Sequence, residues 1–378
     1  MARVRIALVH SFYSSRWPSG ENVVVESQAQ ALRDAGHEVL LLGRHTDDLQ
    51  VQPGYGARAA TRVMTGRGGD PTRYLQAFAP DVVHVHNLFP NIGTQWLEQW
   101  PGPVVATVHN FRSMCANGLL FRDGQVCTEC PDGDPWAALR HSCYRGSRLA
   151  TLPLAVKNSR GIVGDAVLSR ADRIVVLLAG VASILERYGL DLTRTRVIPH
   201  FVSDVTPAVA PTPTTQAWVV VGRLTPEKGV ASLVSEWPPG VRLDVVGEGS
   251  EATKLTADGV QLLGNMDRDE LRRRLPSYTG LILPSVCLES ALPQTAMEAL
   301  EAGVPIVARS GSLAAMDLKD TGAAVLWDDH GPIAPMLDRV RHGGASMRAR
   351  ARAVYETNYM PAAWIESLIS CYHEVITS

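Results

Sequence analysis

The stretch WVVVGRLTPEKG, residues 218–229, joins a run of apolar residues to a loop bounded by Gly222 and Gly229. A short apolar run that ends in such a loop is typical of a buried strand in a parallel sheet. The loop carries Arg223 and Lys228, a planar guanidinium and a mobile ammonium, which together suit a diphosphate. The alternative interpretation is a surface turn with two solvated cations.

The same alternation of apolar runs and helical segments fills both halves of the chain. In the second half we expect strands over residues 218–221, 243–246, 260–263, 281–283 and 306–308. In the first half we expect them over residues 5–9, 39–42, 82–85, 104–108 and 174–177. This pattern predicts an α/β protein with parallel sheets, whose ligands bind beyond the carboxyl ends of the strands.

The length of 378 residues suggests two or three domains at roughly 100–200 residues each. Residues 206–217 are rich in Pro and Thr and form the best candidate linker. We therefore expect two Rossmann-like domains facing each other across a cleft. The first spans residues 1–200 with a cysteine-containing insert at 113–146, and the second spans 201–357. Residues 358–378 are expected to form a helix that packs back on the first domain.

The segment ESALPQTAMEALE, residues 289–301, follows the strand expected at 281–283. Pro293 fits the first turn of a helix, so backbone N–H groups near Gln294 and Thr295 are free to meet a phosphate. Glu298 lies about one turn further, where a carboxylate can accept both hydroxyls of a ribose. The alternative is that Glu298 only balances the helix dipole.

These motifs, in this order, resemble the GT-B-fold retaining glycosyltransferases of family 4. The likeness covers nearly the whole chain. In the second half it rests on GRLTPEKG and on ESALPQTAMEALEAGVPIVA, and in the first half on DVVHVHN (81–87), VVATVHNFR (104–112) and the opening loop PSGEN. One branch of the family carries a cysteine-containing insert after the strand that ends at His109.

The resemblance implies an enzyme that moves a sugar, with retention, from a UDP-, GDP- or dTDP-sugar to a hydroxyl acceptor. The acceptor class stays open between polysaccharides, lipid-linked intermediates and secondary metabolites. Catalytic roles fall on Arg223, Lys228, Glu289 and His109. Donor-binding roles fall on Gly20, Gly222, Gly247, Gly249, Pro293, Gln294, Thr295 and Glu298. Acceptor-side roles fall on His86, Asn87, Asn110 and Arg112.

No cofactor is expected for catalysis, because fixed cations and a helix N-terminus can stabilise the leaving diphosphate without a metal. One departure from the family concerns its two glutamates, which usually have seven residues between them. Here Glu289 and Glu298 have eight, and Ser290 occupies the usual position. The extra residue leaves open whether Glu289 keeps the family role.

Four of the six cysteines lie close together in the sequence, namely Cys115, Cys127, Cys130 and Cys143. Four thiolates suffice for a tetrahedral structural zinc, which would order a segment too rich in Gly, Pro and charge to build its own core. The alternatives are four free thiols or a redox pair at Cys127 and Cys130. His141 is an alternative ligand.

The net charge of −2 gives no support for nucleic-acid binding. No targeting or membrane-spanning segment stands out, so we expect a cytoplasmic enzyme, with peripheral contact at the inner membrane face left open. Arg140, Arg145 and Arg148 form a basic cluster beside the cysteines. Its interpretations are a solvated surface, or contact with an anionic membrane or a phosphorylated or lipid-linked acceptor.

Two rival functions remain at this point: a nucleotide-sugar epimerase of the same architecture, and a non-catalytic binding subunit. The loop at 222–229 argues against the first, and the shifted Glu289 is the only support for the second. We further expect the arginines of residues 268–274 and 339–352 to lie on exposed helix faces.

Overall fold

The computed structural model describes residues 3–16, 20–205, 215–328 and 331–377, and these form two compact units. Unit 1 comprises residues 1–120, 127–198 and 365–378. Unit 2 comprises residues 121–126 and 199–364. Of the expected linker, residues 206–214 lie outside the described residues, as do residues 17–19 of the opening loop.

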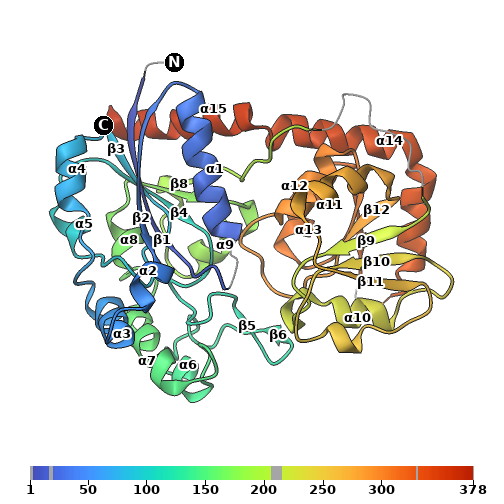
Figure 1. Ribbon diagram of the computed structural model, residues 1–378, viewed down its shortest axis with the longest axis horizontal. Coiled ribbons are helices and arrows are strands. Elements are labelled where there is room, and N and C mark those ends of the chain that lie inside the picture. The colour runs from blue at the N-terminus through green and yellow to red at the C-terminus, as the bar shows by residue number, and fades with distance from the viewer. Residues whose placement is uncertain (1–2, 17–19, 206–214, 329–330, 378) are drawn as a thin grey trace. The chain divides into compact units, whose positions relative to one another are not determined.

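Unit 1 is built on a six-stranded parallel sheet (Figure 1). Its spatial order is β2 (Glu38–His45), β1 (Arg5–Phe12), β3 (Val82–Val85), β4 (Val104–Val108), β7 (Arg173–Val176) and β8 (Thr195–Val197). The strands β1, β3 and β4 are almost wholly buried, which explains their continuous apolar runs. All the strands expected in this half are present, with ends that differ by a few residues.

The helices of unit 1 lie in the connections between these parallel strands. They are α1 (Gly20–Asp34), α2 (Thr46–Gln50), α3 (Tyr55–Thr65), α4 (Thr72–Phe78), α5 (Trp96–Gln99), α6 (Ala137–Arg140), α7 (Arg148–Asn158), α8 (Ala166–Arg170) and α9 (Ala179–Arg187). A two-stranded hairpin, β5 (Phe121–Arg122) with β6 (Gln125–Val126), interrupts the segment before α6 and is grouped with unit 2.

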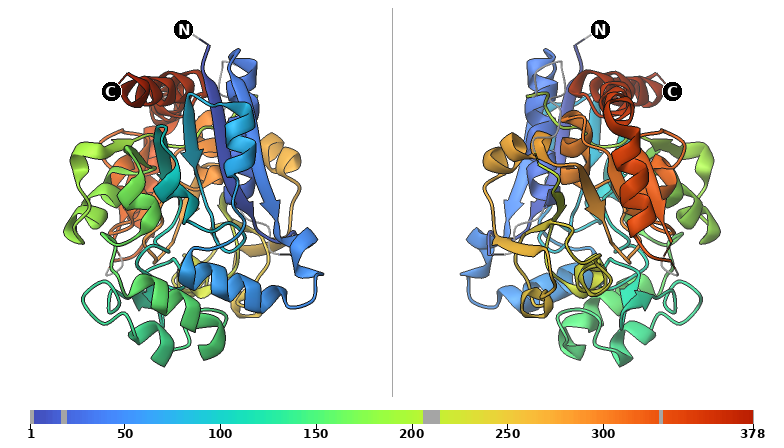
Figure 2. Two further views of the ribbon diagram at one scale, coloured as in Figure 1. Left: turned by 90° about the vertical axis from the view of Figure 1, so that its left-hand side faces the viewer. Right: turned by 90° about the vertical axis from the view of Figure 1, so that its right-hand side faces the viewer.

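The last helix, α15 (Pro361–Ile376), ends against the sheet of unit 1, as Figures 1 and 2 show. The hydroxyl of Tyr372 lies 2.6 Å from Nδ1 of the buried His84 on β3. Glu374 accepts hydrogen bonds from Arg173 at 2.7 Å and from Arg196. These contacts tie the end of the chain to β3, β7 and β8.

Unit 2 repeats the design with a second six-stranded parallel sheet. Its spatial order is β11 (Val260–Gly264), β10 (Leu243–Val246), β9 (Trp218–Val221), β12 (Gly280–Leu283), β13 (Ile306–Arg309) and β14 (Ala324–Trp327). Its helices are α10 (Val230–Ser235), α11 (Arg268–Arg274), α12 (Gln294–Glu301), α13 (Leu313–Leu318) and α14 (Ala334–Asn358). Trp218 and Trp327 are fully buried in its core. The α/β fold class predicted from the sequence is confirmed.

The prediction that the arginines of 268–274 and 339–352 are exposed is wrong in part. The side chains of Arg272 and Arg352 are only 10% and 12% exposed, because both pair with the buried Glu301. Arg348 is buried as well, since its guanidinium donates hydrogen bonds to the carbonyls of Tyr278 and Pro276. A buried carboxylate and buried carbonyls need such donors, which the sequence pattern does not reveal.

Candidate active site

The loop at residues 222–229 begins where β9 ends, in the middle of the sheet of unit 2. A turn at residues 247–249 packs against it so closely that only glycine fits. A Cβ on Gly247 would lie 1.9 Å from the carbonyl oxygen of Gly222, and one on Gly249 would lie 2.2 Å from that of Leu224. The amide of Leu224 donates to the carbonyl of Glu248 at 2.8 Å. The glycines predicted to line the donor site thus hold the loop in place.

The loop that follows β12 packs on the other side of residues 222–229. Gly229 has a φ of +66°, and a Cβ there would lie 2.3 Å from the carbonyl oxygen of Pro284. The amide of Val286 donates to the carbonyl of Glu227 at 3.1 Å. These contacts bring the segment that carries Glu289 next to the loop that carries Lys228.

Lys228 and Glu289 form an ion pair, and the hydroxyl of Ser285 donates to the same carboxylate at 2.8 Å. Burial lowers the pKa of Lys228, but the adjacent Glu289 carboxylate outweighs it and raises that pKa above its ordinary value. Lys228 is therefore a cation at neutral pH. Despite the extra residue before Pro293, the Glu289 carboxylate lies at the ammonium of this loop.

Arg223 is more accessible, with a side chain that is 64% exposed and lies 3.4 Å from a carboxylate oxygen of Glu227. The hydroxyl of Thr225 also donates to Glu227, at 2.7 Å. Glu227 therefore anchors the turn from inside, and the Arg223 guanidinium stays open to solvent.

Helix α12 begins directly after Pro293, with Gln294 and Thr295 in its first turn. Glu298 is buried, and its carboxylate accepts from Nε of Arg268 at 2.6 Å. Burial raises the pKa of Glu298, and Arg268 opposes this rise. Glu298 was predicted to bind a ribose, and its pairing with Arg268, expected only as a residue of an exposed helix face, was not predicted.

In unit 1 the predicted acceptor-side residues gather at the carboxyl ends of β3 and β4. His86 and Asn87 follow β3, and His109 and Asn110 follow β4. Nδ1 of His86 lies 2.9 Å from Nε2 of His109. Asn87 has a local structural role, since its side chain bonds the amide and carbonyl of Phe89.

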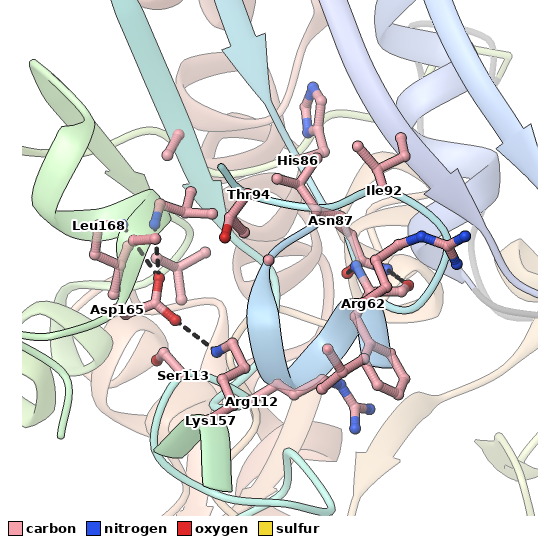
Figure 3. Close-up of a pocket in the computed structure, with 18 of the residues that line it drawn as sticks. Arg62, His86, Asn87, Ile92, Thr94, Arg112, Ser113, Lys157, Asp165 and Leu168 are labelled. Carbon is pink, nitrogen blue, oxygen red and sulfur yellow. Dashed lines mark hydrogen bonds and ion pairs between the residues drawn. The ribbon is translucent and has the colours of Figure 1, made fainter. Parts of the chain in front are cut away.

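These residues line a cavity of about 360 Å³, shown in Figure 3. Arg112 lies in its wall, with the guanidinium 4.6 Å from the ring centre of Phe89 and a hydrogen bond of 3.0 Å to the carbonyl of Ala116. Lys157 and Asp165 form a 2.6 Å ion pair at its edge. The cavity is lined by apolar side chains together with histidines, amides and charged residues of both signs.

Glu21 also lines this cavity and was missed by the sequence analysis. Burial raises the pKa of its carboxyl, whereas the charge of Arg112 and a hydrogen bond from Asn110 lower it. The result is a pKa of about 7. Its Oε2 accepts from Nδ2 of Asn110 at 3.4 Å. The sequence feature that could have identified Glu21 is its position directly after Gly20 in the motif PSGEN. Gly20 itself opens α1, and a Cβ there would meet no atom within 4 Å.

The four clustered cysteines are all free thiols in this structure. Burial raises the pKa of Cys130 to about 12, and Cys115, Cys143 and Cys127 add to this rise, so the four thiols lie near one another. The Cys115 thiol donates to Oδ1 of Asn117 at 2.9 Å. Among the described residues, no three His, Cys, Asp or Glu side chains are arranged so that they could hold a metal ion. The zinc therefore stays a prediction.

Two family models match the chain, one for each half. Glycosyltransferase Family 4 matches residues 18–204, and Glycosyl transferases group 1 matches residues 215–336. No functionally curated protein matches the sequence.

Solved structures match along nearly the full chain, at low sequence identity. Sucrose-phosphate synthase from Thermosynechococcus elongatus is 17% identical, with a TM-score of 0.69 over 99% of this chain and 100% of that one. The lipopolysaccharide outer core galactosyltransferase WaaB is 13% identical, with a TM-score of 0.61 over 98% and 99%. HepE from Anabaena, solved with UDP and glucose, is 15% identical, with a TM-score of 0.60 over 97% and 99%.

The two parallel sheets and the two family models define the class: this is a glycosyltransferase with the GT-B fold. Within that class, the chain belongs to the family 4-like glycosyltransferases.

Proposed function

We propose that the chain transfers a sugar from a nucleotide-diphosphate sugar to a hydroxyl acceptor, with retention of the anomeric configuration. Unit 2 would bind the donor and unit 1 the acceptor. The observation that carries the proposal is the set of cations at the loop after β9. There Lys228 and Arg223 stand beside the Glu289 loop, at the carboxyl edge of a parallel sheet where such folds bind ligands.

The chemistry follows from where charge develops. As the bond between the sugar and the diphosphate breaks, the leaving oxygen becomes more negative, and fixed cations stabilise that change. Lys228 would then exchange part of its contact with Glu289 for the diphosphate. Glu289, released toward the sugar, would accept hydrogen bonds from its hydroxyls.

Retention is assigned to attack from the face that the leaving group occupies. The acceptor oxygen forms the new bond to the anomeric carbon, the bond to the phosphate oxygen breaks, and the acceptor proton passes to the departing phosphate. This route needs no nucleophile from the protein and no metal. A chelator should therefore leave turnover unchanged, and NMR of the product should show the anomeric configuration of the donor.

The test of donor binding is thermal unfolding with UDP, GDP, ADP and dTDP and their common sugars. A ligand that binds only the native state raises the unfolding temperature as its concentration exceeds the Kd. UDP-sugars come first, because HepE was solved with UDP and glucose. A shift with one nucleotide supports the proposal and identifies the donor base. No shift with any of them, for folded protein, would contradict it.

The structural zinc is a separate proposal, supported by the nearness of the other three clustered thiols to Cys130. Binding would require the thiols to turn toward a common centre, since Cys115 now donates to Asn117. We expect elemental analysis of chelator-washed protein to find about one zinc per chain. Less than about a tenth of an equivalent in folded protein would remove the proposal.

A further inference from the structure

Helix α7 exposes leucine where a surface helix normally exposes polar residues. Leu149 is 85% exposed, the highest value among the large apolar side chains of the described residues that lie at the surface. Leu152 is 37% exposed, and Val163, shortly after the helix, is 66% exposed. Leu149 and Leu152 are three residues apart and so share one face. The buried residues of α7, which pack within unit 1, are Thr151, Pro153, Leu154, Ala155 and Asn158.

Arginines border this apolar face. Arg145 and Arg148 stand at the N-terminal end of α7, and Arg160 follows its C-terminal end. All three are exposed, and within the described ranges no carboxylate forms an ion pair with any of them. Arg140, in contrast, is neutralised by Asp134 and does not contribute.

The position of Arg148 runs against helix electrostatics. The N-terminus of a helix carries partial positive charge, so a cation in the first turn is unfavourable and an acidic residue is favourable. The first turn of α7 holds no acidic residue, and Arg145 lies just ahead of it. Unpaired cations held at such a position favour an anionic partner.

We propose that the exposed face of α7, formed by Leu149 and Leu152 and bordered by Arg145 and Arg148 at its start and Arg160 after its end, docks on an anionic lipid bilayer. Apolar side chains on one helix face with basic residues around them are the features of a helix that lies in the membrane interface. The arginines would contact lipid phosphates and the leucines would enter the acyl boundary. Among the described residues, no helix has the length and apolar character needed to cross a bilayer.

The exposed face of α7 lies next to the cavity of unit 1. Lys157, at the end of α7, and Arg160 also line the cavity of unit 1. Helix α6 packs beside α7, as Figures 1 and 2 show, and carries Trp136, another exposed apolar residue, at its start. A bilayer on this face would place lipid-borne acceptors next to the cavity, a consequence that rests on the proposed function.

The experiment is vesicle flotation of the full chain, without donor or acceptor, so that its result does not depend on catalysis. Phosphatidylcholine vesicles with phosphatidylglycerol are compared with phosphatidylcholine alone. We expect binding only to the anionic vesicles, weakened by added salt. Failure to bind anionic vesicles at moderate salt would overturn the proposal and leave the proposed function untouched.

Two double variants test the two halves of the surface. Each arginine near an anionic surface contributes roughly fivefold to binding. Arg145→Gln/Arg148→Gln should therefore weaken vesicle binding by on the order of tenfold or more. Leu149→Gln/Leu152→Gln should also weaken it by on the order of tenfold. All four side chains are solvent-exposed or half-exposed, so thermal unfolding should stay as in the parent chain. Unchanged binding in either double variant overturns the proposal.

Matched controls lie elsewhere on the chain. Val51→Gln removes an apolar side chain that is 79% exposed, and Arg339→Gln removes an exposed cation of α14. Both should bind vesicles like the parent chain. A self-association that depends on Leu149 and Leu152, without vesicle binding, would assign the face to a second copy of this chain and would also overturn the proposal.

Discussion

The two units place their candidate sites at the same edge of similar parallel sheets, yet they handle charge differently. In unit 2 the chemistry-bearing residues are paired acids and bases, Lys228 with Glu289 and Arg268 with Glu298. In unit 1 the cavity is lined by apolar side chains together with histidines, amides and charged residues, among them Glu21, whose pKa is about 7. Among the described residues that line it, Lys157 and Asp165 form an ion pair.

The difference indicates what each site is prepared to bind. A buried ion pair is costly to leave unpartnered, but a phosphate can replace the carboxylate as the partner of Lys228. A site of paired charges is thus prepared for an anionic ligand that exchanges one partner for another. The cavity of unit 1 sets histidine and amide groups beside apolar side chains, which suits the hydroxyls and carbons that an acceptor sugar or alcohol would present.

The largest expected effect comes from removing the central cation of unit 2. Lys228→Ala should lower kcat by on the order of 10²-fold or more, because the leaving diphosphate loses its fixed positive charge. The measurement is steady-state turnover of the donor that thermal unfolding identifies. Lys254→Ala is the matched control, since this lysine also pairs with a glutamate, Glu251, and is largely exposed.

A double variant separates catalysis from stability. Lys228→Ala alone leaves the Glu289 carboxylate buried without its cation, which should lower the unfolding temperature. Lys228→Ala/Glu289→Gln removes both partners and should regain much of that stability without regaining turnover. If the double variant recovers activity along with stability, the lysine is a structural partner and the comparison between the units fails.

The second prediction concerns two glutamates of α12 that are equally buried. Glu298→Gln should weaken binding of the donor nucleotide by on the order of tenfold, about 1.4 kcal/mol, through loss of a charged acceptor for the ribose. Glu301→Gln should leave nucleotide affinity unchanged but lower the unfolding temperature, because Arg272 and Arg352 lose their shared partner. Calorimetric titration measures the affinities, and equal Kd values for both variants would reject the ribose role.

The site around Glu298 also shows which features could be predicted from the sequence and which could not. The α/β class, most of the strands and the position of the loop at 222–229 follow from apolar runs ended by glycine, a pattern of short range. The glutamate at 298 could be picked out by its offset from Pro293. Its partner Arg268 could not, because the pairing joins α11 to α12 through the fold and leaves no periodic signal.

Irregular segments were the least predictable. The edge strand β8 has the sequence TRV, with two polar residues, and reads as a loop. Five non-glycine residues of the described chain have left-handed backbone. Four of them lie in the segment that runs from Cys115 to the start of α7, namely Leu120, Asp123, Ser142 and Arg145. At Leu120, Ser142 and Arg145 such backbone is imposed by tertiary packing, whereas Asp123 and Gly124 form the two-residue turn of the β5–β6 hairpin, which this pair favours locally. The sequence therefore shows that four cysteines are clustered in this segment, but it does not predict how their thiols are arranged.

The smallest expected effect on catalysis is in unit 1 and concerns Glu21, whose titration also changes stability. Its pKa of about 7 in the folded state lies above the ordinary 4.5, so the folded protein holds a proton that the unfolded chain releases between these values. The free energy of unfolding should therefore fall as the pH rises from about 4.5 to about 7, and then level off. Glu21→Gln should remove this contribution. Denaturant unfolding at several pH values measures the slope.

The same titration should reach the acceptor. When Glu21 ionises it changes from a hydrogen-bond donor to an acceptor beside Asn110, so the KM for the acceptor should change a few-fold around pH 7 in the parent chain. In Glu21→Gln the acceptor KM should be flat across that range, while the KM for the donor follows the parent chain. A donor KM that moves with Glu21 instead would mean that this carboxyl serves the charged ligand, and the contrast between the two units would not hold.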